Sequence, residues 1–271
     1  ARHRGARWPP MGKDKGKVST LSATRLHFPA GTGAIPAATV QHLRNYAAST
    51  QELGIAAAIA VNCLEAEVKG IMAEAAPGMD FVVLHVPVWG AFVPALNTLL
   101  GEAQRRGVRH ILYQSLEVRC HPLVLDKLLN HLTRDTLVVG PVLEGHVFQE
   151  GEQPLNGRSS PWNTLALWSM RKLALTGFLH IADGMPRPSE TFTRQVSGDI
   201  GDLLDEDDGL QSPAMGSSAW WNIARQETEP AGAIPAGVEE VTAIALLQHL
   251  LGKEQARAVL VDLPAELAGL V

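Results

Sequence analysis

The fold is decided by the stretch Ile111-Leu112-Tyr113-Gln114-Ser115-Leu116-Glu117-Val118, which is followed closely by Cys120-His121-Pro122. The stretch is an apolar run that turns polar towards its end, as expected for a buried strand that reaches the edge of a sheet. Pro122 then suits the first position of a helix. This order of strand, short turn and helix predicts one unit of an alternating α/β fold.

The same alternation extends along the chain on both sides of this stretch. Strands are predicted over residues 18–28, 55–64, 81–88, 110–118 and 136–142. Helices are predicted between them over residues 36–53, 65–76, 94–106 and 122–132. The strands are continuous apolar runs, which is typical of a parallel sheet covered on both faces. The predicted fold class is therefore α/β, a single Rossmann-like domain with a mostly parallel central sheet and helices on both faces.

The pattern changes after Phe148. Residues 162–179 carry apolar side chains at helical spacing and predict an amphipathic helix. Residues 238–251 predict another helix, and residues 256–263 a short strand or helix. Between them, residues 183–236 are rich in Gly, Pro, Ser and acidic residues, which predicts a long irregular loop. The first 17 residues are predicted to be a disordered basic tail, with the stump of a transit peptide as the alternative.

Composition excludes several classes of function. The formal net charge of −5 argues against a general nucleic-acid binder, which would need a basic face. The apolar runs are shorter than the ~20 residues that a membrane-spanning helix needs. Cys63 and Cys120 are too few for a disulfide framework or a four-cysteine zinc site. We expect both to be buried free thiols, which favours a reducing compartment such as the cytoplasm or an organelle stroma or matrix.

Ligands of parallel α/β sheets bind beyond the carboxyl ends of the strands, so polar residues at these ends are the candidates for a site. We expect Asn62, Glu117 and the turn at residues 87–90 to meet at this edge. Glu117 and His121 carry side chains that ligate metals. The alternatives are a surface carboxylate paired with a neighbouring Arg or Lys, and a histidine that only makes structural hydrogen bonds.

In their order, these segments resemble the GT-A glycosyltransferases, most closely the inverting family 2 type, over residues 18–251. In that family the second strand ends in an Asp that contacts the nucleotide base, and Asn62 stands there. Asn97 lies in the segment that matches the family's third helix. Ser115 and Glu117 take the two acidic places of the Asp-x-Asp motif. The resemblance implies that residues 18–148 bind the nucleotide and residues 149–271 face the acceptor.

The resemblance further implies a nucleotide-diphosphate sugar as donor and Mn²⁺ or Mg²⁺ as its metal. Because Ser115 replaces the first metal-facing acid, Glu117 would be the remaining ligand, with help from His121. Trp162 would stack against a sugar ring. The donor contacts expected from the resemblance are Asn62, Asn97, Ser115, Glu117 and Trp162.

The family's late Glu-Asp motif supplies the catalytic base, and Glu239 and Glu240 take its place. One of them would deprotonate the hydroxyl of an acceptor, so that the sugar is transferred with inversion. The substitutions at 62 and 115 keep an alternative open, an inactive protein of the same fold that serves as an interaction module. A different nucleotide-binding α/β enzyme is a third possibility.

Overall fold

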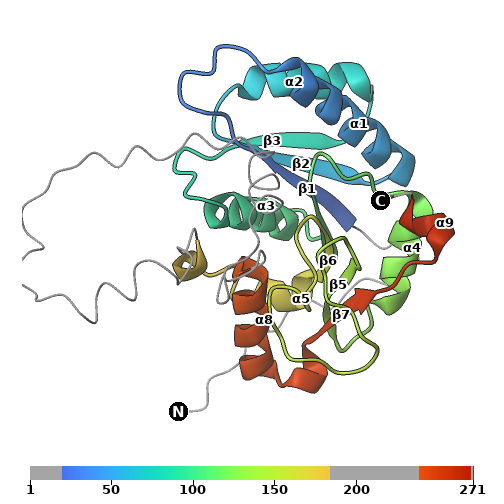
Figure 1. Ribbon diagram of the computed structural model, residues 1–271. Coiled ribbons are helices and arrows are strands. Elements are labelled where there is room, and N and C mark those ends of the chain that lie inside the picture. The colour runs from blue at the N-terminus through green and yellow to red at the C-terminus, as the bar shows by residue number, and fades with distance from the viewer. Residues whose placement is uncertain (1–19, 184–237, 270) are drawn as a thin grey trace, which may run out of the picture.

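A seven-stranded sheet, with the order β3-β2-β1-β4-β6-β5-β7, runs through the centre of the computed structural model (Figure 1). The structure describes residues 20–183, 238–269 and 271. The strands are β1 (Thr20–Leu26), β2 (Ala56–Val61), β3 (Phe81–His85), β4 (His110–Gln114), β5 (Thr136–Pro141), β6 (Leu165–Ser169) and β7 (Arg257–Val261). The predicted 1–17 tail and almost all of the predicted 183–236 loop lie outside the described residues.

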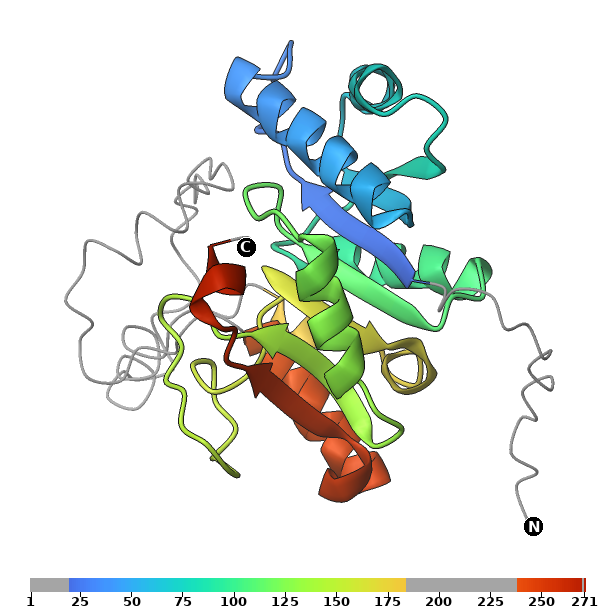
Figure 2. The ribbon, with the colours of Figure 1, turned by 90° about the vertical axis from the view of Figure 1, so that its right-hand side faces the viewer.

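The helices cover both faces of the sheet, which confirms the predicted fold class. They are α1 (Ala37–Leu53), α2 (Glu65–Ala75), α3 (Val93–Arg105), α4 (Pro122–His131), α5 (Met170–Leu173), α8 (Val238–Leu251) and α9 (Ala265–Ala268), with short 3-10 turns η1 (His180–Ala182) and η3 (Lys253–Gln255). Helices α1, α2 and α4 pack together over one face, and α3, α5 and α8 lie over the other (Figures 1 and 2).

The strands are parallel except for β6, which is antiparallel to both of its neighbours, β4 and β5. The predicted strands at 55–64, 81–88 and 110–118 are indeed parallel members of one sheet. They are shorter than predicted, and β1 separates β2 from β4. The last residues of the predicted strands, 62–64, 86–88 and 115–118, lie beyond the observed strand ends.

The predicted helix at residues 162–179 is wrong. Residues 165–169 form β6, and only the short α5 and a turn at Gly177 follow. Leu165 and Leu167 pack towards the α4 side, while Ala166 and Trp168 pack towards the α3 side. A strand buried on both faces has no polar face, so its continuous apolar run cannot be distinguished from a buried helix by periodicity.

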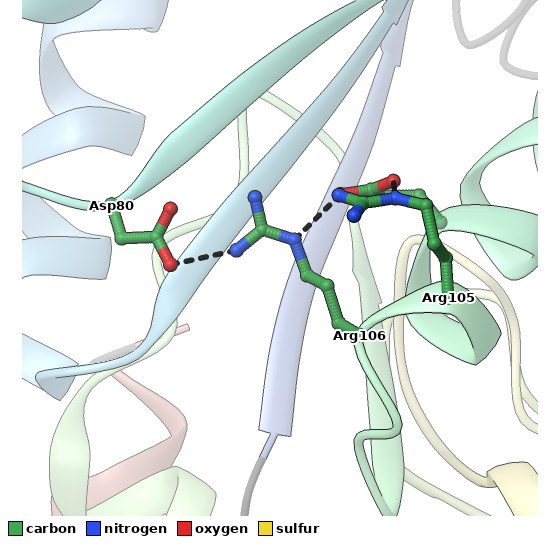
Figure 3. A network of polar contacts seen from close by, with 4 residues as sticks. Asp80, Arg105 and Arg106 are labelled. Carbon is green, nitrogen blue, oxygen red and sulfur yellow. Dashed lines mark hydrogen bonds and ion pairs between the residues drawn. The ribbon is translucent and has the colours of Figure 1, made fainter.

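Charges at the amino end of the sheet neutralise one another. The Arg106 guanidinium donates to Asp80 at 2.7 Å and to the buried Glu102 at 2.6 Å, and Arg105 also donates twice to Glu102 at 2.6 Å (Figure 3). The Arg105 hydrogen bond holds the pKa of Glu102 below its ordinary value. This network ties the end of α3 to β3, and because its carboxylates are already paired, its role is structural.

Across the described parts of the chain, none of the helices has the length and apolar character that would let it cross a lipid bilayer.

Candidate active site

The polar residues of the candidate site lie at the point in the sheet where successive strands stop being added on one side and continue on the other. From β1 the chain passes outward to β2 and β3, and α3 then returns it to β4 on the other side of β1. The carboxyl ends of β1 and β4 therefore flank a topological switch point, where ligands of open α/β sheets usually bind. Arg25 lies at the end of β1, and Ser115 directly follows β4.

Arg25 faces the side of the sheet that α3 and α8 cover. Residues of β1 alternate between faces, and Leu21 and Ala23 both belong to the core on the α3 side. The guanidinium carbon of Arg25 lies 4.9 Å from the ring centroid of Phe92, at the start of α3. The side chain is 30% exposed, so its charge is open to a ligand at this edge.

Two adjacent acids at the start of α8 face the same place. The Glu239 carboxylate comes within 3.9 Å of the Arg25 guanidinium, and its side chain is 11% exposed. Glu240 is more deeply buried, and its Oε1 accepts a hydrogen bond of 2.6 Å from the backbone N–H of Asn163. The helix N-terminus favours acids on electrostatic grounds, but it does not require that they be buried.

Burial controls the protonation of Glu240. Loss of solvent, together with the nearby charge of Glu239, raises the pKa of Glu240 to about 8, against smaller opposing effects from the Asn163 N–H and Arg25. At neutral pH this carboxyl is therefore mainly protonated. Perturbed acids of this kind concentrate at functional sites, although structural acids are shifted too.

The turn before β6 holds Glu240 in place. Asn163 donates its backbone N–H to Glu240, and its side-chain Oδ1 accepts a hydrogen bond of 2.9 Å from the Trp168 indole. The next residue, Thr164, accepts a hydrogen bond of 2.9 Å from the N–H of Ser115. The acid pair, the end of β4 and the start of β6 are thus joined through the backbone.

The N-terminus of α3, next to Arg25, holds a carboxylate from a distant part of the chain. Asp183 accepts hydrogen bonds from three consecutive backbone N–H groups: Ala91 at 3.1 and 3.2 Å, Phe92 at 2.5 Å and Val93 at 2.9 Å. These are groups that a helix leaves without intrahelical partners, and a negative charge there is stabilising. Asp183 thereby fixes the β3–α3 loop beside the switch point.

We expect Gly90→Ala to destabilise the fold more than Gly78→Ala does. Both glycines have positive φ, +60° and +78°, so an alanine costs roughly 1–2 kcal/mol at either position. A Cβ at Gly90 would also overlap Asp183 Oδ2, whereas no described atom lies within 4 Å of a Cβ at Gly78. The added cost at Gly90 should be roughly 1–3 kcal/mol by urea unfolding. Equal costs would mean that the loop relaxes freely.

Two residues that were predicted to contact the sugar donor form hydrogen bonds with the protein backbone instead. The Asn62 amide exchanges two hydrogen bonds of 2.8 Å with the backbone N–H and C=O of Phe28. The Asn97 amide does the same with the backbone of Phe178, at 2.9 Å each. The structure thus gives both side chains a clear structural task, and their contact with a donor stays a prediction.

Trp162 is also occupied by the fold. Its ring stacks on His146 at a centroid distance of 3.9 Å, and its indole N–H donates to the Gly157 carbonyl at 2.5 Å. The residue is buried, so stacking against a sugar would need one of its packed faces to open. Its neighbour Asn163, which is not among the predicted donor contacts, is the residue that contacts the acid pair.

The two residues predicted to bind a metal, Glu117 and His121, both follow β4, and their binding of a metal stays a prediction. His121 Nδ1 accepts the N–H of Leu123 and so caps α4, and its Nε2 lies 3.7 Å from Glu52. Glu117 is exposed on the turn after β4. Within residues 20–183, 238–269 and 271, no three His, Cys, Asp or Glu side chains gather closely enough to hold a metal ion. Glu117 and His121 alone would offer a Mn²⁺ or Mg²⁺ ion one carboxylate and one imidazole, so no step below uses a metal.

No protein-family model matches this sequence, and neither does any curated protein. Three solved structures are similar to it in backbone arrangement, with TM-scores of 0.37, 0.36 and 0.38. The first is a protein provisionally assigned as a nucleotide-diphospho-sugar transferase from Desulfovibrio desulfuricans, with 12% identity, covering 65% of this chain and 72% of that one.

The second is S. aureus TarS, with 12% identity over 58% of this chain and 48% of that one. The third is the 4-diphosphocytidyl-2C-methyl-D-erythritol synthase of Anaerococcus prevotii, with 13% identity over 86% of this chain and 99% of that one. Because the identities and TM-scores are low, the chemistry of the site must be argued from this chain's own residues.

Proposed function

We propose that this protein binds a nucleotide-diphosphate sugar at the β1–β4 switch point and transfers the sugar to a hydroxyl acceptor with inversion. The observation that carries the proposal is the Arg25 guanidinium facing the Glu239–Glu240 pair at that point. A guanidinium matches the geometry and charge of a diphosphate, which is the leaving group of such a transfer. In the proposed complex the reacting carbon of the sugar lies between them, so the 3.9 Å contact of Arg25 with Glu239 opens, and the carboxylate acts as the base from the face opposite the diphosphate.

The burial of the two acids assigns them different roles in this proposal. Glu240 is fixed by Asn163 and is mainly protonated at neutral pH, so it is unsuited to accept a proton. Glu239 lies nearer the open edge and closer to Arg25, and we assign it the role of general base. Arg25 contacts the diphosphate and stabilises the charge that develops as the bond to the sugar breaks.

Calorimetry tests the proposal through Arg25. We expect the protein to bind a member of a panel of uridine, guanosine and cytidine diphosphate sugars, with or without added Mn²⁺. Arg25→Met should weaken that binding at least tenfold, because a hydrogen bond to a charged group contributes about 1.5–3 kcal/mol. Arg44→Met is the matched control, since Arg44 also pairs with a glutamate, Glu74, but on the exposed surface of α1 and α2. Equal binding by both variants would remove Arg25 from the site.

One observation favours the alternative, a catalytically inactive interaction module. The polar groups of Asn62 and Asn97 and one ring face of Trp162 are engaged in the fold. A protein that retained the scaffold without its chemistry could use donor-contact positions in this way. The same calorimetry separates the two functions, because an interaction module would bind no member of the nucleotide-sugar panel.

A further inference from the structure

A row of buried hydroxyl groups runs along β1, beneath α1. Thr20, Ser22 and Thr24 alternate with Leu21 and Ala23, so they share the face of β1 that α1 covers. The Ser22 hydroxyl lies 2.9 Å from the hydroxyl of Tyr46 on α1, which satisfies both groups. The hydroxyls of Thr20 and Thr24, one on each side, have no hydrogen-bond partner among the described residues.

The neighbouring strand β4 carries a matching pair of polar side chains. Thr20 is the register partner of His110, and the register continues from Ala23–Tyr113 to place Thr24 beside Gln114. His110 and Gln114 alternate with Ile111 and Tyr113, and Leu112 between them packs against α4. Because α1 and α4 cover the same face, each threonine and its partner point to the same side of the sheet.

Both partners also have a buried atom without a hydrogen-bond partner among the described residues. These atoms are Nδ1 of His110 and Oε1 of Gln114. Four of the buried atoms without a hydrogen-bond partner therefore lie on residues that are paired across β1 and β4. Burial lowers the pKa of His110 to about 4, so its imidazole is neutral at pH 7. A buried polar group without a partner costs roughly 1–3 kcal/mol, so two such pairs on adjacent strands need an explanation.

The spacing of the strands suits one water molecule in each pair. Neighbouring strands lie about 4.8 Å apart, and neither threonine hydroxyl makes a direct hydrogen bond to its partner on β4. A water molecule with two hydrogen bonds of about 2.8 Å can join atoms up to about 5.6 Å apart. Water is also the small polar ligand that proteins routinely enclose between such groups.

We propose that two enclosed water molecules complete the seam between β1 and β4, one joining Thr20 to His110 and the other joining Thr24 to Gln114. The second water has a further effect because the Gln114 amide N–H₂ donates to the Val118 carbonyl at 2.7 Å. Thr24, the water and Gln114 thus connect β1 to the Ser115–Val118 turn. Thr24 and Gln114 are therefore positioning residues for the turn at the switch point.

Magnetic relaxation dispersion of water ¹⁷O, measured on the full chain, tests the proposal directly because it counts water molecules with long residence times. The unaltered protein should hold at least two. Thr20→Val and Thr24→Val keep the β-branched shape and remove the hydroxyl, so each should lose one long-lived water. Thr50→Val is the matched control, because the buried Thr50 hydroxyl already donates to the Tyr46 carbonyl at 2.8 Å. It should leave the count unchanged.

The outcomes separate the two water sites. If only Thr24→Val loses a long-lived water, the proposed water beside Gln114 is supported and the one beside His110 is overturned. If only Thr20→Val loses one, the water beside His110 is supported and the one beside Gln114 is overturned. Fewer than two long-lived waters in the unaltered protein, or no loss in either variant, would overturn the proposal. Hydrogen exchange tests the positioning role: Thr24→Val, but not Thr20→Val, should speed exchange at the Val118 amide, which bonds Ser115 across the turn. Nucleotide-sugar binding is not needed for either result.

Discussion

Glu240→Gln is expected to make the protein more stable than the unaltered chain at pH 8. The variant's free energy of unfolding should also fall less between pH 5 and 8 than that of the unaltered chain. Burial, followed by the charge of Glu239, raises the pKa of Glu240 from 4.5 in its ordinary setting to about 8 in the fold. A glutamine keeps the acceptor for the Asn163 N–H and remains neutral at every pH. The measurement is the free energy of urea unfolding as a function of pH.

The sign follows from proton binding in the two states. Between pH 4.5 and 8 the unfolded chain has released the Glu240 proton, while the folded chain still holds it. Unfolding then releases a proton, so stability falls as pH rises through this window. The stability that the neutral acid provides is complete below about pH 4.5 and is lost by about pH 8. The loss should reach a few kcal/mol.

Glu74→Gln is the control for this prediction, because Glu74 is an exposed residue paired with Arg44. It should keep the pH dependence of the unaltered protein, including the contributions of the histidines. Glu239→Gln should reduce the slope in part, since the charge of Glu239 contributes to the raised pKa. If Glu240→Gln kept the full slope, Glu240 would be ionised in the fold at neutral pH, and its assignment as the neutral member of the pair would be wrong.

The parallel part of the fold could be predicted because each of its segments has a strong local signal. Gly54, for example, ends α1 in the left-handed conformation, with φ of 64°, directly after the helix predicted at residues 36–53. The helix predicted at 238–251 has the observed bounds of α8. Strand β6 could not be predicted, since the run from Leu165 to Trp168 is apolar on both faces and lies between two strands distant in sequence.

The candidate site could be located from sequence only as an edge of the sheet. The parallel order places Asn62 and Glu117 at the same carboxyl edge, after β2 and β4. The direction in which each amide points depends on tertiary contacts, and the bonds of Asn62 to Phe28 join residues that are 34 positions apart. A local pattern contains no such information.

Arg25 had a signal that the sequence argument did not use. It is a cation within the otherwise uncharged strand Thr20–Leu26, and a charge in a central strand needs either a buried partner or a ligand. Asn163 had no comparable signal, because the backbone group that bonds Glu240 is common to every residue except proline. Backbone donors at a site can be found only once the turn that presents them is known.

Glu239→Gln is expected to lower the turnover of sugar transfer by about 10²–10⁴-fold, the range that a positioned general base contributes. The glutamine fills the same volume but cannot take the proton of the acceptor hydroxyl. Nucleotide-sugar affinity should change little, because Arg25, which contacts the diphosphate in this proposal, is retained. The measurement is the initial rate of nucleotide-diphosphate release in the presence of a hydroxyl acceptor, using the sugar donor that calorimetry identifies.

Three comparisons make this result specific to Glu239. Glu74→Gln should turn over at the rate of the unaltered protein, and thermal unfolding of Glu239→Gln at pH 5 should stay close to that of the unaltered chain. Arg25→Met should lose donor affinity, whereas Glu239→Gln should lose rate at saturating donor, which separates binding from chemistry. Full turnover by Glu239→Gln would place the base elsewhere. If Glu239→Gln kept full turnover and Glu240→Gln lost it, the roles of the two acids would be reversed. Glu240, the more buried of the two, would then be the acid that contacts the substrate.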